Sequence, residues 1–156
     1  MNVIQAARRL CDRQADYLEC ATHLPDGPLS NWPAGLIAGT GPQVGQALRM
    51  FVAAYEGQRL ALMNPEIVAR EGEERGREAC LSLPGYVGED IRRAARIVVK
   101  GQNVRGKPLR LADEGWYAPI LQHEIDHLDG ILFIDHLDRP GTLHAVRAPV
   151  DRPAVG

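Results

Sequence analysis

Five consecutive residues, His123-Glu124-Ile125-Asp126-His127, constrain the fold of this chain more than any other feature. Two histidines four positions apart share one face of an α-helix, where both imidazoles can reach one metal ion. Glu124 lies beside that face and can reach a water molecule in an open metal position. The alternative is a surface helix with solvated histidines, because His and Glu also occur together on such helices by chance.

The neighbouring residues favour a buried helix. Leu121, Ile125 and Leu128 occupy adjacent helical positions. Buried His and Glu side chains need partners, and a divalent cation satisfies all of them. A third protein ligand is then expected, and Cys80 is the natural candidate. A lone cysteine is, however, more often a small buried apolar residue than a ligand.

The limits of this helix are readable from its flanks, and we expect it to cover about Trp116 to Leu128. Asp113 and Glu114 suit the positive end of its dipole, and Gly130 suits its C-terminal cap. Pro119 must lie in the first turn, where a missing N–H group does no harm.

The rest of the chain predicts short strands and one more helix. Periodicity predicts a helix over residues 3–21, and Leu24–Gly45 holds too many Gly and Pro residues for a helix or a central strand. Glu71–Gly76 is charged and expected to be exposed. Two hairpins are expected, one joining Leu48–Ala54 to Leu60–Met63 and one joining Arg96–Val99 to Pro108–Leu111. The expected fold is α+β: a single domain over 1–156, with antiparallel or mixed hairpins around a buried metal-binding helix and a loosely ordered tail over 139–156.

Composition excludes several classes of protein. The 156 residues are 45% hydrophobic and 24% charged, which fits one folded domain without disulfide support. A net charge of −2 argues against nucleic-acid binding, and no 18-residue apolar stretch predicts a membrane span. Asp12, Asp16 and Glu19 argue against a targeting peptide, and three cysteines without framework spacing fit a reducing cytoplasm.

Three motifs together resemble those of peptide deformylases. They are Pro-Gln-Val-Gly at Pro42–Gly45, Glu-x-Cys-Leu-Ser at Glu78–Ser82 and Gln-His-Glu-x-Asp-His-Leu-Asp-Gly at Gln122–Gly130. They occur in the family's order and at similar separations, and the resemblance covers roughly Gly35 to Leu137. Other proteins with the His-Glu-x-x-His pattern do not pair it with an upstream Cys-Leu-Ser.

The resemblance implies a role for each matching residue. Cys80, His123 and His127 would hold one metal ion, and Glu124 would activate a metal-bound water and later protonate the departing amine. The side-chain amide of Gln43 and the backbone N–H of Leu81 would bind the developing oxyanion, an arrangement that makes physical sense for preorganised donors. The implied reaction removes the N-formyl group from the N-terminal methionine of new polypeptides and releases formate.

The resemblance also implies a cofactor, a partner and a compartment. The cofactor would be one divalent ion per chain, Fe²⁺ in the cell, with Zn²⁺, Ni²⁺ or Co²⁺ as alternatives that suit the same ligands. The partners would be N-formylmethionyl peptides, including nascent chains at the ribosome, in a bacterial cytoplasm. Neither the native metal nor the oligomeric state, monomer or dimer, is readable from the sequence.

A side-chain pocket for methionine is expected near these motifs. Val44, Trp116 and Ile120 are candidates by position, although each could equally be ordinary core. Gly45 and Ala79, beside the motif residues, are further candidates for substrate contact. Arg93 resembles an arginine near the family's substrate-binding side, whereas most surface arginines are only solvated charges.

One motif departs from the family's pattern. Leu36 and Ala38 replace two glycines, and Thr40 and Gly41 replace two alanines, upstream of Gln43. Three hypotheses follow: an active deformylase, a weak or inactive descendant that binds metal and formylated peptides, and a small metalloprotease. The retained Glu124 and Gln43 favour the first, and Cys80 fits the third poorly.

Overall fold

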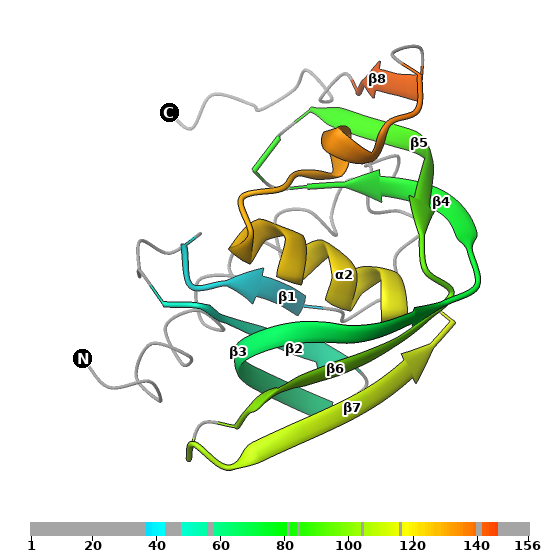
Figure 1. Cartoon of the computed structure of the whole chain (residues 1–156). Helices are drawn as coiled ribbons and strands as arrows, with labels where there is room; N and C mark the ends of the chain where they lie inside the picture. The colour runs from blue at the N-terminus through cyan, green and yellow to red at the C-terminus, as the bar shows by residue number, and fades with distance from the viewer. Residues whose placement is uncertain are drawn as a thin grey trace, which may run out of the picture.

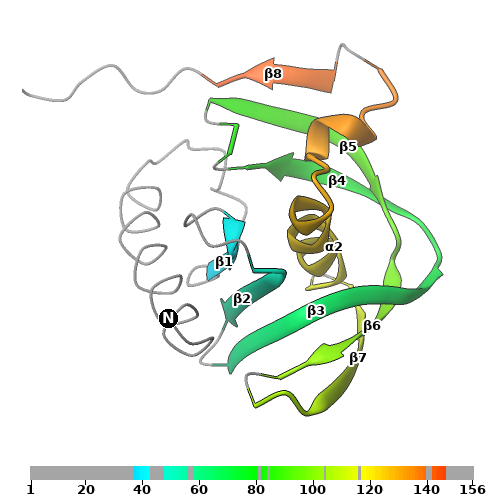
Figure 2. The same ribbon diagram turned by 60° about the vertical axis from the view of Figure 1, so that its left-hand side comes forward.

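The computed structural model describes residues 37–42, 48–55, 58–80, 82–83, 85–103, 105–115, 117–139 and 142–146. Within them, two antiparallel sheets enclose one α-helix, α2, which runs over Tyr117–Leu128 (Figure 1). Figure 2 shows the helix between the smaller sheet and the larger one. This arrangement confirms the expected α+β fold around a buried helix, and every strand pair among the described residues is antiparallel.

The larger sheet has five strands in the order β1-β2-β3-β6-β7. Both predicted hairpins lie in it, β2 with β3 and β6 with β7, and both are confirmed. The strands are β1 at Ile37–Thr40, β2 at Met50–Tyr55, β3 at Gln58–Glu71, β6 at Arg96–Gln102 and β7 at Pro108–Glu114.

The smaller sheet has three strands in the order β4-β5-β8, and the sequence analysis did not predict it. Its strands are β4 at Glu74–Ala79, β5 at Tyr86–Arg93 and β8 at Leu143–Ala145. The outward positions of β4 and β5 carry charged residues. These strands therefore lack the clear alternation of apolar and polar residues by which a strand is recognised in a sequence. A short 3₁₀ helix, η2 at Phe133–His136, packs beneath this sheet.

Three expectations about loops need correction. Ile37–Thr40, expected to be irregular, forms β1, because an edge strand needs only one partner. Residues 74–76 belong to β4 and are not a loop, although most of Glu71–Gly76 is exposed as expected. Leu143–Ala145, in the segment expected to be a loose tail, pairs with β5. The predicted helix over 3–21 and residues 147–156 lie outside the described residues.

Helix α2 begins and ends where the sequence analysis placed it. Pro119 lies in the first turn, and Gly130 adopts a φ of 75° just beyond the C-terminus. Ile131 N–H donates to the carbonyl of Asp126 at 2.9 Å, and Gly130 N–H donates to that of His127 at 3.3 Å. These two bonds form a Schellman cap, which requires a residue with positive φ. Asp113 and Glu114 end strand β7 and do not lie in the first turn of α2. The expectation that they interact with the helix dipole was therefore wrong.

The core lies mainly between α2 and the five-stranded sheet. Leu121 and Ile125 on the helix pack against Phe51, Leu62 and Ile97 from the sheet. A second cluster joins Cys80, Ile91 and Phe133 under the three-stranded sheet. The helix therefore shares its apolar face with one sheet and turns its other face toward the second.

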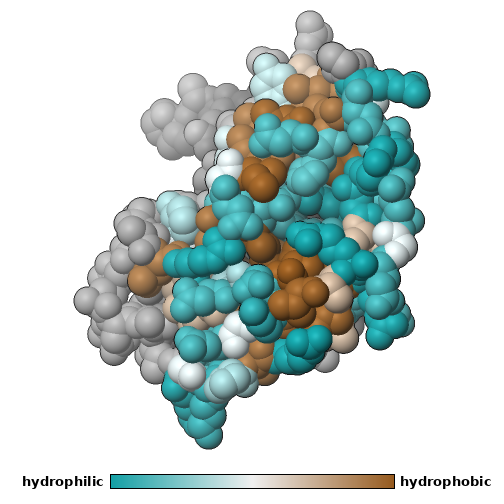
Figure 3. Space-filling model, viewed as in Figure 1, coloured by the Kyte–Doolittle hydropathy of each residue, from teal (hydrophilic) through white to brown (hydrophobic). Residues whose placement is uncertain are grey.

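On the face seen in Figure 3, hydrophobic residues lie in separate patches between hydrophilic ones. The large apolar side chains that stand most exposed among the described residues are Val68 at 36% and Tyr86 at 46%. No helix in the described part of the chain has the length and apolar character needed to cross a membrane.

Candidate metal centre

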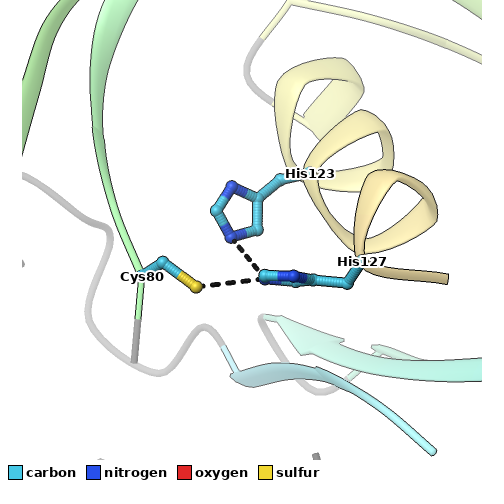
Figure 4. A group of neighbouring side chains, drawn as sticks. All are labelled: Cys80, His123 and His127. Carbon is cyan, nitrogen blue, oxygen red and sulfur yellow. Dashed lines mark hydrogen bonds between the residues drawn. The ribbon is translucent and has the colours of Figure 1, made fainter. Parts of the chain in front are cut away.

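Three metal-ligating side chains meet between β4 and α2 (Figure 4). Cys80 directly follows β4, and His123 and His127 stand one turn apart on α2. Cys80 Sγ lies 3.0 Å from His127 Nε2, which lies 3.1 Å from His123 Nε2. The three donor atoms all lie within 4.8 Å of one another, so a single ion can contact all of them.

Glu78 sets the orientation of the His123 ring. His123 Nδ1 lies 2.8 Å from Glu78 Oε2, and both side chains are buried. Because a carboxylate only accepts hydrogen bonds, Nδ1 donates to Glu78, and Nε2 is the ring nitrogen that remains for a metal ion. Burial alone would raise the pKa of Glu78, but hydrogen bonds from Arg93 and His123 lower it to about 2.

Cys80 has the character of a thiolate. Burial would raise the pKa of its thiol, and hydrogen bonds from His123 and His127 outweigh that effect and lower it to about 5. The backbone N–H of Ser82 also donates to Sγ, at 3.4 Å. One thiolate and two imidazoles suit Zn²⁺, Fe²⁺ and related ions, so the residues present fit a bound divalent metal.

Glu124 lies next to the three ligands and is 4% exposed. Its Oε2 atom is buried and has no hydrogen-bond partner among the described residues. Burial raises the pKa of Glu124 to about 7. A carboxyl group that titrates near neutral pH can accept a proton in one step and return it in the next.

A buried ion cluster supports the site from behind. Arg93, only 6% exposed, donates to both oxygens of Glu78 at 2.6 and 2.9 Å and also to Asp126. Asp126 Oδ2 in turn lies 2.8 Å from His136 Nε2. We call Glu78, Arg93, Asp126 and His136 the Arg93 cluster. It joins β4, β5, α2 and η2, and through Glu78 it reaches His123, a candidate metal ligand.

Gln122 fastens the helix to the turn between β5 and β6. Its amide accepts from the Ala94 N–H at 3.0 Å and donates to the Ala94 carbonyl at 2.9 Å. A second donation reaches the Ala118 carbonyl at 3.1 Å. Because Ala94 follows Arg93, these bonds also hold the strand that carries the ion cluster.

A cavity of about 540 Å³ opens beside the centre. His123 and Glu124 line it on one side and strand β4 on the other. Ile120, a candidate pocket residue, also lines it, together with Pro119. Water and a small peptide can therefore reach the buried carboxylate from this cavity.

The predicted substrate residues have different placements. Arg93 reaches the cavity wall, but its guanidinium is held by Glu78 and Asp126, so it is a buried ion-pair partner and not a solvated surface charge. Ala79 is buried on β4 beside Cys80. The remaining candidates lie outside the described residues: Gln43, Val44, Gly45, Leu81 and Trp116.

No role was expected from the sequence for Glu78, Asp126, His136 or the Gln122 side chain. One signal was available: Gln122 and Asp126 are polar residues on a helix whose neighbouring positions are apolar. A polar side chain on the buried side of a helix requires a hydrogen-bond partner. Their partners were not identifiable, because Arg93 ends β5, a strand that was not predicted, and Ala94 directly follows it.

Comparison with known proteins gives one family. The family model described as "Polypeptide deformylase" matches residues 34–142. A peptide deformylase from Dehalococcoides mccartyi (strain CBDB1) is 44% identical over 122 residues, covering 77% of this chain and 71% of the relative.

Solved structures agree with the sequence comparison. The peptide deformylase from Thermus thermophilus superposes with a TM-score of 0.69 at 36% identity, covering 90% of this chain and 77% of that one. The peptide deformylase from Synechococcus elongatus, solved in complex with actinonin, gives a TM-score of 0.63 at 36% identity, covering 67% and 58%. With the family model matching most of its length, this chain belongs to the polypeptide deformylase family.

Proposed function

We propose that this chain removes the N-formyl group from the N-terminal methionine of newly made polypeptides and releases formate. The observation that carries the proposal is the convergence of Cys80, His123 and His127 beside the buried carboxylate of Glu124, whose Oε2 atom has no hydrogen-bond partner among the described residues. The cavity along β4 gives a peptide access to that carboxylate. Membership of the deformylase family supports the same reaction.

The protein residues divide the work between holding and proton transfer. Cys80, His123 and His127 would hold a divalent ion, which when bound supplies the Lewis acidity that makes water a nucleophile near neutral pH. Glu124 accepts a proton from the attacking water, whose oxygen forms a bond to the formyl carbon. The C–N bond then breaks, Glu124 returns the proton to the departing amine, and formate leaves.

Two further groups complete the proposal from the resemblance. The Gln43 amide and the Leu81 N–H would donate to the oxygen that becomes negative during attack. Both lie outside the described residues, so their support is the motif that each belongs to. Two of the altered positions are compatible with this role, because Ala38, where the family has glycine, and Thr40, where it has alanine, lie in the extended backbone of β1, which accommodates side chains.

The proposal also names a metal ion and a cellular compartment. A thiolate with two imidazoles suits Fe²⁺, Zn²⁺, Co²⁺ and Ni²⁺ alike, and we favour Fe²⁺ in the cell from the resemblance. Formylated nascent chains, the proposed substrate, arise at ribosomes, which favours a bacterial cytoplasm.

Formate release from formyl-Met-Ala-Ser tests the proposal, with protein loaded anaerobically with Fe²⁺ or Co²⁺. Glu124→Gln should lower the rate by at least about 100-fold, because general acid–base catalysis contributes that much, while one metal ion per chain remains bound. Glu114→Gln, the same change on the exposed end of β7, should leave the rate unaltered. Metal binding without formate release would favour the inactive descendant instead.

A further inference from the structure

Gly76 stands in the interior of β4, where nothing in the local backbone requires a glycine. Its φ is not among the positive values found in the described glycines, and a Cβ built there meets no described atom within 4 Å. A glycine inside a strand weakens it and often marks a place where a ligand approaches closely. The missing side chain therefore needs an explanation other than turn geometry.

Strand alternation shows which way a side chain at this position would point. Glu78, two residues further along β4, faces α2 and bonds to His123. Residues two apart share a face of a strand, so position 76 faces α2 as well. Its cross-strand partner Ile91 is fully buried on that same face. The irregularity in pairing falls on β5, where Asp90 has a φ of 62°, so β4 keeps its alternation.

The cavity extends along this face of β4. Its lining includes Glu78, Gly76 and Glu74 from the strand and Pro119 and Ile120 from the helix. The Glu74 end of β4 and the Pro119 end of α2 therefore border the same cavity. The four steps of strand from Glu78 to Glu74 span about 13 Å.

A methionine side chain is short by comparison. The formyl carbon must lie near Glu124, and the Cα of the same residue is two bonds away, so the first side chain enters this cavity. An extended methionine side chain reaches about 5 Å from its Cα, which leaves the stretch beyond Gly76 unfilled. Gly76 stands about 6.6 Å along the strand from Glu78, where a longer side chain would pass.

We propose that Gly76 determines the depth of the first side-chain pocket, so that this chain accepts formylated residues longer than methionine. The inference rests on the proposed function, because it takes the formyl group to lie beside Glu124. The substrate class is formyl-peptides whose first side chain is a linear apolar group of more than four non-hydrogen atoms. A Cβ-branched side chain at position 76 would end the pocket at the length of methionine.

Two tripeptides test the proposal: formyl-Met-Ala-Ser and its analogue with a hexyl side chain at the first residue. Dissociation constants are measured by calorimetry in the cobalt-loaded Glu124→Gln protein, so that turnover does not interfere. Two additional buried methylenes should make the hexyl peptide bind about tenfold more tightly than the methionine peptide. In Glu124→Gln with Gly76→Val this preference should disappear or reverse.

Ala112→Val is the control, because it also places a valine at an exposed strand position, and Ala112 does not line the cavity. It should keep the hexyl preference. Valine favours a strand, so Gly76→Val should melt at or above the temperature of the parent protein, which separates pocket filling from misfolding.

Each outcome gives a decision. Weaker binding of the hexyl peptide to the parent protein, or an unchanged preference in Gly76→Val, overturns the proposal, as does failure of both peptides to bind. A hexyl preference lost only in Gly76→Val supports it. Formate release by the Glu124 protein is scored separately, so a protein that binds with this preference but releases no formate contradicts only the proposed function.

Discussion

Helix α2 presents two faces of opposite character to the two sheets. Toward the five-stranded sheet it offers Leu121 and Ile125, which pack into an apolar cluster. Toward the three-stranded sheet it offers His123, Glu124 and Asp126, all buried. The first face is held by apolar burial, which is non-directional, whereas the second depends on hydrogen bonds with fixed partners and distances.

The two faces therefore differ in how strictly they fix the position of the helix. An apolar interface tolerates small shifts, because its energy follows the area buried. The polar face allows no such shift: Glu78 must reach His123 and Arg93 at once, and an unpartnered charge there is strongly unfavourable. The candidate metal centre thus lies on the face of α2 whose position is fixed by hydrogen bonds to specific partners.

The largest effect should come from Arg93→Met. Removing the guanidinium leaves Glu78 and Asp126 buried without a cation, which should lower the free energy of unfolding by about 4 kcal/mol. Urea denaturation measures it. Arg96→Met, at a half-exposed arginine 3.7 Å from Glu71, should change stability by less than about 1 kcal/mol. Equal losses of stability for the two substitutions would contradict the claim that the polar face depends on its buried ion pairs.

Leu121→Ala should follow, on the apolar face. Leu121 is fully buried, and the cavity left by its truncation should lower the free energy of unfolding by about 3 kcal/mol. The folded protein should still bind one metal ion per chain, since the polar face is untouched. Val68→Ala, at an exposed position, is the control. Loss of metal from folded Leu121→Ala protein would show that the two faces are not independent.

Metal removal should have a somewhat smaller effect. An ion that joins Cys80 after β4 to two histidines on α2 stabilises the folded state by about 2.7 kcal/mol when its free concentration is 100 times Kd. Chelation should therefore lower the melting temperature. Cys80→Ser should abolish most of the difference between metal-loaded and metal-free protein; a difference of unchanged size would exclude Cys80 as a ligand.

The smallest effect should come from the outer surface of the three-stranded sheet. Asp138 accepts hydrogen bonds from Arg92 at 2.9 Å and Arg75 at 3.3 Å, and Arg92 above all lowers the pKa of Asp138. A lowered pKa means that the stabilisation is complete above the ordinary value near 3.8 and is lost as pH falls through the folded-state value.

Asp138→Asn should therefore flatten the fall in stability below about pH 4, slightly and only at low salt, because exposed pairs are screened. Thermal melts of both proteins between pH 2 and 6 measure it. A slope that stays the same in low salt would mean that this ion pair does not contribute to stability.

Local patterns explain what was predictable. The helix, its Pro119 start and its Gly130 cap follow from short-range rules, and both hairpins follow from apolar runs separated by turn residues. The three-stranded sheet was missed because its strands carry charge on their outward face. Its pairing depends on partners distant in sequence, such as β8 with β5.

By itself the sequence determined the two histidines and the glutamate on one helix, because an i to i+4 spacing places side chains together whatever surrounds them. It also determined the family, since the motifs are local and ordered. Only the tertiary structure decided that Arg93, 15 residues from Glu78 and 33 from Asp126, lies buried between them. Such contacts arise when strands pair and a helix packs across them, and no local spacing encodes that geometry.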